Sequence, residues 1–160
     1  TIEAGVPLNI IINVIKDFMG VEHRIEYVRD KNGVRYYNDS KGTNPDSSIK
    51  ALEAMSRPTI LIAGGYDKHS EFDEFIEAFD NKVKLMVLLG QTADKIEETA
   101  VRHGFTNIIK TDSLEKAVKI CAENAVSGDV VLLSPACASW GMFKNYEERG
   151  KLFKEYVNSL

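Results

Sequence analysis

Three short stretches of this 160-residue sequence concentrate the side chains that could do chemistry. Asn38–Asn44 offers a carboxylate, an ammonium, two hydroxyls and two amides. Gly64–Ser70 combines two glycines with Lys68, and Ser134–Ser139 is built of small residues whose amides, with the Ser139 hydroxyl, can approach a ligand closely. Two lysines with hydroxyl and amide donors favour an anion, and cations on two sides of a crevice suit a small dicarboxylate better than one phosphate.

Each stretch also has a purely structural explanation. Asn38–Asn44 can be a solvated turn that caps the next helix, but a lysine at the positive end of a helix is costly unless it meets an anion. Gly64–Ser70 is neither G-x-G-x-x-G nor a phosphate loop of the G-x-x-x-x-G-K-[ST] type. Ser139 has no G-x-S-x-G turn and no obvious histidine partner, and Cys137 is typical of a small packed residue, so we expect no nucleophile here.

Alternating helices and apolar strands must position these loops. Helices are predicted at Pro45–Met55, Glu71–Phe79, Thr92–His103, Ser113–Asn124 and Phe143–Val157, and strands at Thr59–Ala63, Val83–Leu89, Asn107–Ile109 and Asp129–Leu133. The strands are apolar on both faces, as in a parallel sheet covered on both sides. The pattern predicts an α/β fold, a doubly wound Rossmann-like domain whose mostly parallel sheet has helices on both faces.

The N-terminal part of the chain differs from this pattern. Strands at Arg24–Arg29 and Val34–Asn38 flank Lys31-Asn32-Gly33 and predict a β-hairpin. Before it, Leu8, Ile11, Ile12, Ile15 and Phe18 recur at helical spacing behind Pro7, and Gly20 is expected to end that helix.

The composition excludes several classes of protein. A hydrophobic content of 44% and a charged content of 28% predict one globular domain, and a net charge of −4 argues against a nucleic-acid partner. No apolar run reaches membrane-spanning length, so no membrane insertion is expected. Two cysteines, without a C-x-x-C pair, favour a reducing, cytoplasmic location, and three scattered histidines predict no metal site. The start at Thr1 lacks a basic signal-peptide region and suggests processing or a cut from a longer chain.

The same loops carry a family resemblance. The segments EHRIE, NDSKGTNPDS, LIAGGYDK, GQTADKI, GDVVLLSPACAS and FKNYEERG together resemble the C-terminal domain of the Mur ligases over about Val21–Leu160. NDSK stands where other Mur ligases have a histidine-containing loop, and DNPR is absent, so the resemblance favours the members that add D-glutamate to UDP-N-acetylmuramoyl-L-alanine in peptidoglycan synthesis. Those enzymes use ATP and Mg²⁺ to form an acyl-phosphate, which the amine of D-glutamate then attacks.

The resemblance implies roles for individual residues. The residues expected to hold D-glutamate are Lys41, Thr43, Lys68, Ser139 and Tyr146, the last at a position usually occupied by Phe. Arg24 and Asp39 are expected to reach the nucleotide, although both could be surface charges at a strand end. His23 is expected to be structural, and Tyr146–Arg149 is helix surface at least as plausibly as site.

The resemblance also predicts how the chain is divided. Residues 1–20 correspond to the trailing helix of a preceding ATPase domain and a linker, and residues 21–160 to the C-terminal Mur ligase domain. The sequence has no phosphate-binding loop, so catalysis by the chain alone is not expected. Two other readings stay open: a stand-alone module that binds an acidic amino acid or a nucleotide, and a purely structural interaction domain.

Overall fold

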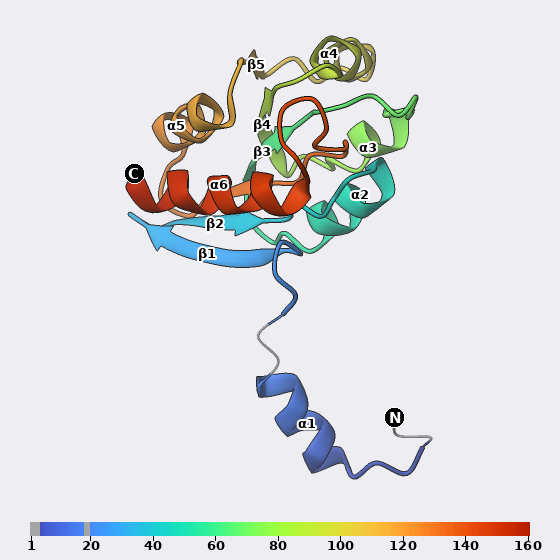
Figure 1. Ribbon diagram of the computed structural model, residues 1–160, viewed down its shortest axis with the longest axis vertical. Helices are drawn as coiled ribbons and strands as arrows, with labels where there is room; N and C mark the ends of the chain where they lie inside the picture. The colour runs from blue at the N-terminus through green and yellow to red at the C-terminus, as the bar shows by residue number, and fades with distance from the viewer. Residues whose placement is uncertain (1–3, 18–19) are drawn as a thin grey trace.

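The computed structural model describes residues 4–17 and 20–160, and its centre is a six-stranded sheet (Figure 1). The strands are β1 (Glu26–Lys31), β2 (Val34–Asn38), β3 (Thr59–Ala63), β4 (Val83–Leu88), β5 (Ile108–Lys110) and β6 (Val130–Leu133). The helices are α1 (Leu8–Asp17), α2 (Pro45–Glu53), α3 (Asp73–Glu77), α4 (Ala93–Arg102), α5 (Leu114–Asn124) and α6 (Tyr146–Ser159). The strand order is β1-β2-β6-β3-β4-β5, with only the β1–β2 pair antiparallel. The predicted mostly parallel α/β sheet with an N-terminal hairpin is confirmed.

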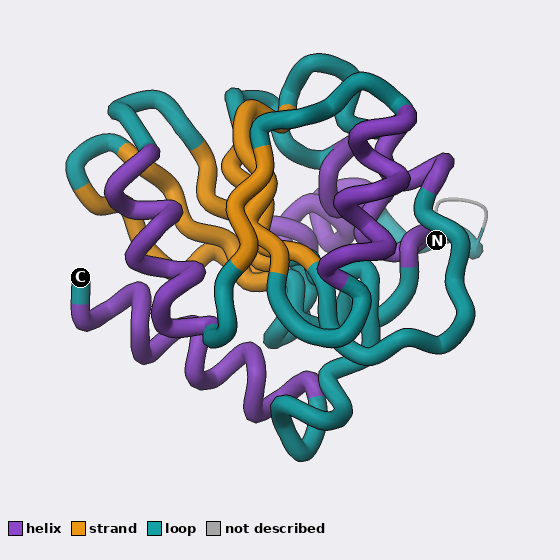
Figure 2. The backbone as a smooth tube through the Cα atoms, turned by 90° about the horizontal axis from the view of Figure 1, so that it is seen from above, coloured by secondary structure: helices purple, strands orange, loops and turns teal. Residues whose placement is uncertain are grey.

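Helices cover both faces of this sheet, as Figure 2 shows for the strands in orange between helices in purple. Alternate residues of each strand point to opposite faces. Leu61 and Ala63 of β3 therefore join the core under α2, α3 and α4, whereas Ile60 and Ile62 join the core under α5 and α6. Burial on both faces explains why β3 reads as a continuous apolar run.

The hairpin turn forms where the sequence predicts it. Asn32 and Gly33 have φ values of 55° and 81°, and positive φ at both central residues is the signature of a tight hairpin turn. The first strand begins at Glu26 rather than Arg24, because Val21–Arg24 forms its own turn, in which the Arg24 N–H donates to the Val21 carbonyl at 3.0 Å.

Side-chain caps define the starts of three helices. Asn44 accepts a hydrogen bond from the Ser47 N–H at 2.9 Å, and Ser113 accepts one from the Lys116 N–H at 3.3 Å. The final helix starts later than predicted, at Tyr146 instead of Phe143, because extended Asn145 caps it through the Glu148 N–H at 2.8 Å.

Helix α1 is formed as predicted, and Figure 1 draws it apart from the sheet and the other helices. Its side chains Leu8, Ile10 and Ile12 are 60%, 50% and 40% exposed. Phe18, which the periodicity includes, lies outside the described residues. Within the described residues, no helix combines the length and the apolar character that a membrane crossing requires.

Candidate functional site

The three polar loops leave the same edge of the sheet. β6 lies between β2 and β3, and all three strands are parallel. Leu133, the last residue of β6, is in register with Asn38 on one side and Ile62 on the other. The loop after β6 is therefore flanked by the loops after β2 and β3, at the sheet edge where open α/β folds bind ligands.

Backbone pairing joins the loop after β3 to the loop after β6. The Gly64 N–H donates to the Pro135 carbonyl at 2.8 Å, and the Tyr66 N–H to the Ala138 carbonyl at 2.9 Å. A Cβ on Gly65 would lie 2.4 Å from the Ala138 carbonyl oxygen, so only glycine permits this approach. The two glycines serve loop packing and leave the side chains that follow them at the surface.

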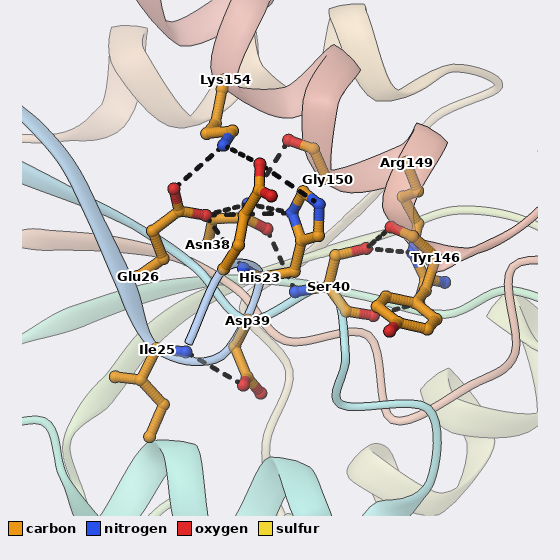
Figure 3. Close-up of polar contacts among 11 residues, drawn as sticks. His23, Ile25, Glu26, Asn38, Asp39, Ser40, Tyr146, Arg149, Gly150 and Lys154 are labelled. Carbon is orange, nitrogen blue, oxygen red and sulfur yellow. Dashed lines mark hydrogen bonds and ion pairs between the residues drawn. The ribbon is translucent and has the colours of Figure 1, made fainter. Parts of the chain in front are cut away.

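Arg149 joins the loop after β2 to the loop after β6, and Figure 3 shows its contacts with Ser40. Its side chain is buried, and Nε and Nη2 donate to the hydroxyl and carbonyl of Ser40 at 3.0 and 2.8 Å. Nη1 donates to the Cys137 carbonyl at 3.1 Å, and the Ser40 hydroxyl donates in turn to the Tyr146 carbonyl at 2.8 Å. Burial lowers the pKa of Arg149 to about 10, which leaves it charged at neutral pH.

Arg149 is not among the site residues predicted from the sequence. The stretch that contains it, Tyr146–Arg149, was predicted to be helix surface at least as plausibly as site. A signal was present, because Arg149, Phe153 and Val157 recur every four residues and form one buried stripe of α6. The charge of the side chain obscured this pattern, since arginine is rarely fully buried without a set of partners.

Lys41 is one of two exposed lysines at this edge. Its Nζ lies 5.9 Å from the centroid of the half-buried Tyr146 ring, and its N–H donates to the His23 carbonyl at 3.0 Å. Thr43 is half-buried, and its N–H donates to the Lys41 carbonyl at 2.9 Å. The structure thus places Tyr146 next to Lys41, and Thr43 in the same loop as Lys41.

Lys68 occupies the opposite side of the loop after β6. Its exposed Nζ lies 5.2 Å from the centroid of the Trp140 ring, and Trp140 directly follows the buried Ser139. Within the described part of the chain, neither the Lys41 nor the Lys68 ammonium has a carboxylate partner in an ion pair. Two uncompensated cations on either side of a buried loop form a site that attracts anions.

Arg24 and Asp39 differ in how they can meet a ligand. Arg24 is exposed beside an open surface cavity that Ile25 and Lys50 also line. Asp39 is fully buried, and its carboxylate accepts hydrogen bonds from the Ile25 N–H at 3.2 Å and the Ser134 hydroxyl at 2.8 Å. Burial raises the pKa of Asp39 to about 6. The Asp39 carboxylate is thus used inside the domain, whereas the Arg24 guanidinium is open to solvent.

His23 anchors the start of the domain to α6 and to the loop after β2 (Figure 3). Because Asn38 accepts from the Ser40 N–H at 3.1 Å, its amide nitrogen faces His23 Nδ1 at 2.9 Å and donates to it. The ring is therefore neutral with its proton on Nε2, and burial lowers its pKa. Lys154 closes the cluster by donating to Glu26 at 2.9 Å. These contacts fit the structural role predicted for His23.

The remaining groups indicate binding rather than covalent chemistry. Burial raises the pKa of the Cys137 thiol to about 11, which makes it a poor nucleophile at neutral pH. Ser139 is buried next to the backbone pairing of the two loops. Among residues 4–17 and 20–160, no three His, Cys, Asp or Glu side chains gather as a metal site.

Comparison with known families assigns the domain. A model of the Mur ligase, glutamate ligase domain family matches residues 23–137, most of the chain. The chain belongs to the Mur ligase family. The match includes the loops after β2 and β3 and the loop after β6 as far as Cys137, so the family assignment covers most of the candidate site.

Curated relatives in this family are similar over nearly the whole chain. The UDP-N-acetylmuramoylalanine–D-glutamate ligase of Lachnospira eligens is 66% identical over 157 residues, and that of Thermoanaerobacter sp. strain X514 is 57% identical over 159 residues. Each match covers 98% of this Mur ligase chain and 35% of the relative. The chain therefore spans about a third of the length of these relatives.

Solved structures confirm the Mur ligase fold at low sequence identity. The UDP-N-acetylmuramate-alanine ligase from Thermotoga maritima matches with a TM-score of 0.68 at 15% identity, over 98% of this chain and 35% of that one. FolC from E. coli, in complex with ADP, matches with a TM-score of 0.59 at 15% identity, over 87% of this chain and 32% of that one. At this identity the likeness concerns the fold alone.

Proposed function

We propose that this chain is the C-terminal, D-glutamate-binding domain of a cytoplasmic, ATP-dependent ligase that adds D-glutamate to UDP-N-acetylmuramoyl-L-alanine in peptidoglycan synthesis. The proposal rests on one observation: Lys41 and Lys68 flank the buried loop that ends at Ser139, and each ammonium lies over an aromatic ring instead of a carboxylate. The hydrogen-bond donors of both ammonium groups are therefore available to a ligand that carries two carboxylates. The relatives whose names include D-glutamate ligase support the same substrate.

The division of labour follows from the chemistry of the side chains. Lys41 and Lys68 supply charge-assisted donors to the two carboxylates of D-glutamate, while Thr43 and Ser139 add hydroxyl donors. Tyr146 packs under Lys41 and limits where its ammonium can lie. By holding D-glutamate at both carboxylates, the domain orients the free amine toward the activated carbonyl of the other substrate.

The proposed nucleotide contacts rest on Arg24 and Asp39. Exposed Arg24 can reach a phosphate or a ribose without disturbing the domain. Asp39 would first have to give up its bond from the Ile25 N–H or the Ser134 hydroxyl. ATP and Mg²⁺ are proposed to be held mainly by a preceding domain, where Mg²⁺ would neutralise phosphate charge.

Residues 1–20 are proposed to be the last helix of that preceding ATPase domain together with a linker. Three apolar side chains of α1, Leu8, Ile10 and Ile12, are exposed, so the helix lacks an apolar partner for them within the described residues. An amphipathic helix gains most of its stability from such a partner. The domain of residues 21–160 then begins at the Val21–Arg24 turn.

The proposal is tested by charge-removing variants of the full-length enzyme. Lys41→Met and Lys68→Met keep the apolar stem and remove the ammonium, so each should raise the KM for D-glutamate about 10- to 100-fold, the equivalent of roughly 1.5–3 kcal/mol per charged hydrogen bond. Lys119→Met is the matched control, because Lys119 pairs with Glu115 on α5, away from the loops. Unchanged D-glutamate kinetics in both loop variants would refute the assignment.

The alternative of a stand-alone binding module makes a different prediction about the gene. A coding sequence that continues upstream of Thr1 and contains a G-x-x-x-x-G-K-[ST] loop supports the ligase. A stop codon directly upstream supports the module, which would bind an acidic amino acid or a nucleotide without turnover. Calorimetry that finds no binding of D-glutamate or ADP to a stand-alone chain would favour a structural interaction domain.

A further inference from the structure

Lys68 rests on a pair of exposed aromatic rings at the mouth of the candidate site. The Trp140 ring lies 5.2 Å below its Nζ, and the Tyr66 ring packs on Trp140 with centroids 5.4 Å apart and planes inclined by 60°. Trp140 and Tyr66 are 54% and 40% exposed, so neither ring serves the core. The Lys68 ammonium is a polar neighbour of this pair.

Backbone pairing joins the two loops that carry these side chains. Tyr66 and Ala138 form an antiparallel bridge between the loops after β3 and β6. Lys68 lies two residues beyond that bridge on one side, and Trp140 two residues beyond it on the other. The bridge thus joins the two loops, and the side chains of Lys68 and Trp140 make the 5.2 Å contact between them, next to the Ser139 position.

The acidic side chain that precedes Lys68 in the sequence is engaged elsewhere. Asp67 accepts a hydrogen bond from the His69 N–H at 2.7 Å and lies 4.0 Å from the Lys95 ammonium. Lys68 is thus held without being neutralised. A carboxylate in the place of Trp140 would hold it equally well but would compete with an anionic substrate, whereas a ring face attracts the cation weakly and leaves its hydrogen-bond donors free.

We propose that Trp140 is a positioning residue for D-glutamate binding: its ring face, supported by Tyr66, holds the Lys68 ammonium where a substrate carboxylate must arrive. This proposal rests on the proposed function, because it assigns Lys68 to D-glutamate. A flexible lysine loses side-chain entropy when a ligand orders it, and a ring that already restricts the ammonium reduces that loss. Trp140 acts through Lys68 and makes no contact with substrate in this scheme.

The test is a double-mutant cycle in the full-length enzyme, with the KM for D-glutamate and kcat measured separately. Trp140→Leu should raise the KM about two- to fivefold, the range of an exposed cation–π contact, with kcat unchanged, and Trp140→Phe should restore part of the loss. In a Lys68→Met background, Trp140→Leu should change the KM no further.

Tyr27→Leu is the matched control. Tyr27 is also 54% exposed and also packs edge-on against another tyrosine, Tyr37, but among the described residues no lysine lies over its ring. It should leave the KM unchanged. Equal thermal unfolding midpoints for both single variants would show that the KM change does not come from misfolding.

The outcomes separate the two proposals. If Lys68→Met raises the KM but Trp140→Leu does not, the positioning role is overturned and the D-glutamate assignment stands. An equal effect of Trp140→Leu in both backgrounds also overturns the positioning role, because the ring then acts without Lys68. If neither Lys68→Met nor Lys41→Met changes the KM, the D-glutamate assignment itself fails.

Discussion

Gly150 in α6 is the position where two physical effects of opposite sign can be separated. Replacing a glycine inside a helix by alanine normally stabilises a protein, by about 0.5–1 kcal/mol, because alanine loses less backbone entropy on folding. At Gly150, however, a Cβ would lie 2.2 Å from Nδ1 and 2.9 Å from Cγ of the His23 ring. The ring is rigid and buried, so it cannot move aside as an exposed lysine could.

The magnitude follows from these contacts. Overpacking a buried site by one methyl group costs about 1–3 kcal/mol. Displacing His23 would also break its 2.9 Å hydrogen bond from Asn38, worth about 1 kcal/mol. Against the gain in helix propensity, we expect Gly150→Ala to lower the free energy of unfolding by about 1–3 kcal/mol.

The measurement is urea denaturation followed by far-UV circular dichroism. Far-UV circular dichroism is preferable to fluorescence because the single tryptophan, Trp140, is 54% exposed and reports poorly on unfolding. The His23→Ala background removes the ring, and there Gly150→Ala should become stabilising by about 0.5–1 kcal/mol. Alanine at position 23 is strained, because the backbone there has a φ of 63°. This strain is present both with and without Gly150→Ala, so it cancels in the comparison.

Two results would refute this reasoning. A Gly150→Ala variant as stable as the parent would mean that His23 yields to the added methyl group. The same loss of stability in both backgrounds would mean that the clash lies with something other than the histidine ring.

Two further predictions concern the buried charges of the site. Arg149→Met removes the three donors that join Ser40 to Cys137. We expect urea denaturation to show a free energy of unfolding lower by about 3 kcal/mol, and the full-length enzyme to have a higher KM for D-glutamate. An unchanged KM would show that the loops hold their positions without Arg149. Burial raises the pKa of Asp39 to about 6, above its ordinary 3.8, so the folded chain holds an extra proton between these values. The contribution of Asp39 to stability therefore falls as pH rises from about 4 to 6. Asp39→Asn should abolish this fall in the free energy of unfolding, which amounts to at most about 3 kcal/mol in the parent protein. Parallel curves of stability against pH for the variant and the parent would contradict the raised pKa of Asp39.

The layered sheet was predictable because the hydrophobic pattern of each strand reflects which of its faces are buried. β3 was predicted to the residue, since Thr59–Ala63 is apolar on both faces and is bounded by Pro58 and Gly64. The positions of the three loops followed from the parallel order of the strands. The start of α6 was predicted three residues early, because the apolar spacing includes Phe143 but the cap at Asn145 decides where helical hydrogen bonds begin.

The buried polar contacts of the site were beyond sequence reasoning for a physical reason. Arg149 and Ser40 are 109 residues apart, and neither residue type signals that it will meet the other in the interior. Asp39 resembles a carboxylate that is available to a ligand, yet it is buried and accepts a hydrogen bond from the hydroxyl of Ser134, 95 residues away. Residue type predicts which groups are reactive, but only the fold determines which of them are already engaged with one another.

The attachment of His23 also determines where any upstream motion can begin. The His23 carbonyl accepts a hydrogen bond from the Lys41 N–H, and its ring accepts one from Asn38, so these bonds attach the chain to the rest of the domain at His23. Gly20 has a φ of 82°, and a Cβ added there would meet nothing within 4 Å. It is the described glycine nearest to His23 on the N-terminal side, and the backbone could pivot there. If the full-length protein is the proposed ligase, rotation of its preceding domain about Gly20 would change the distance between that domain's ligands and Lys41, while the hydrogen bond to His23 keeps the Lys41 backbone in place.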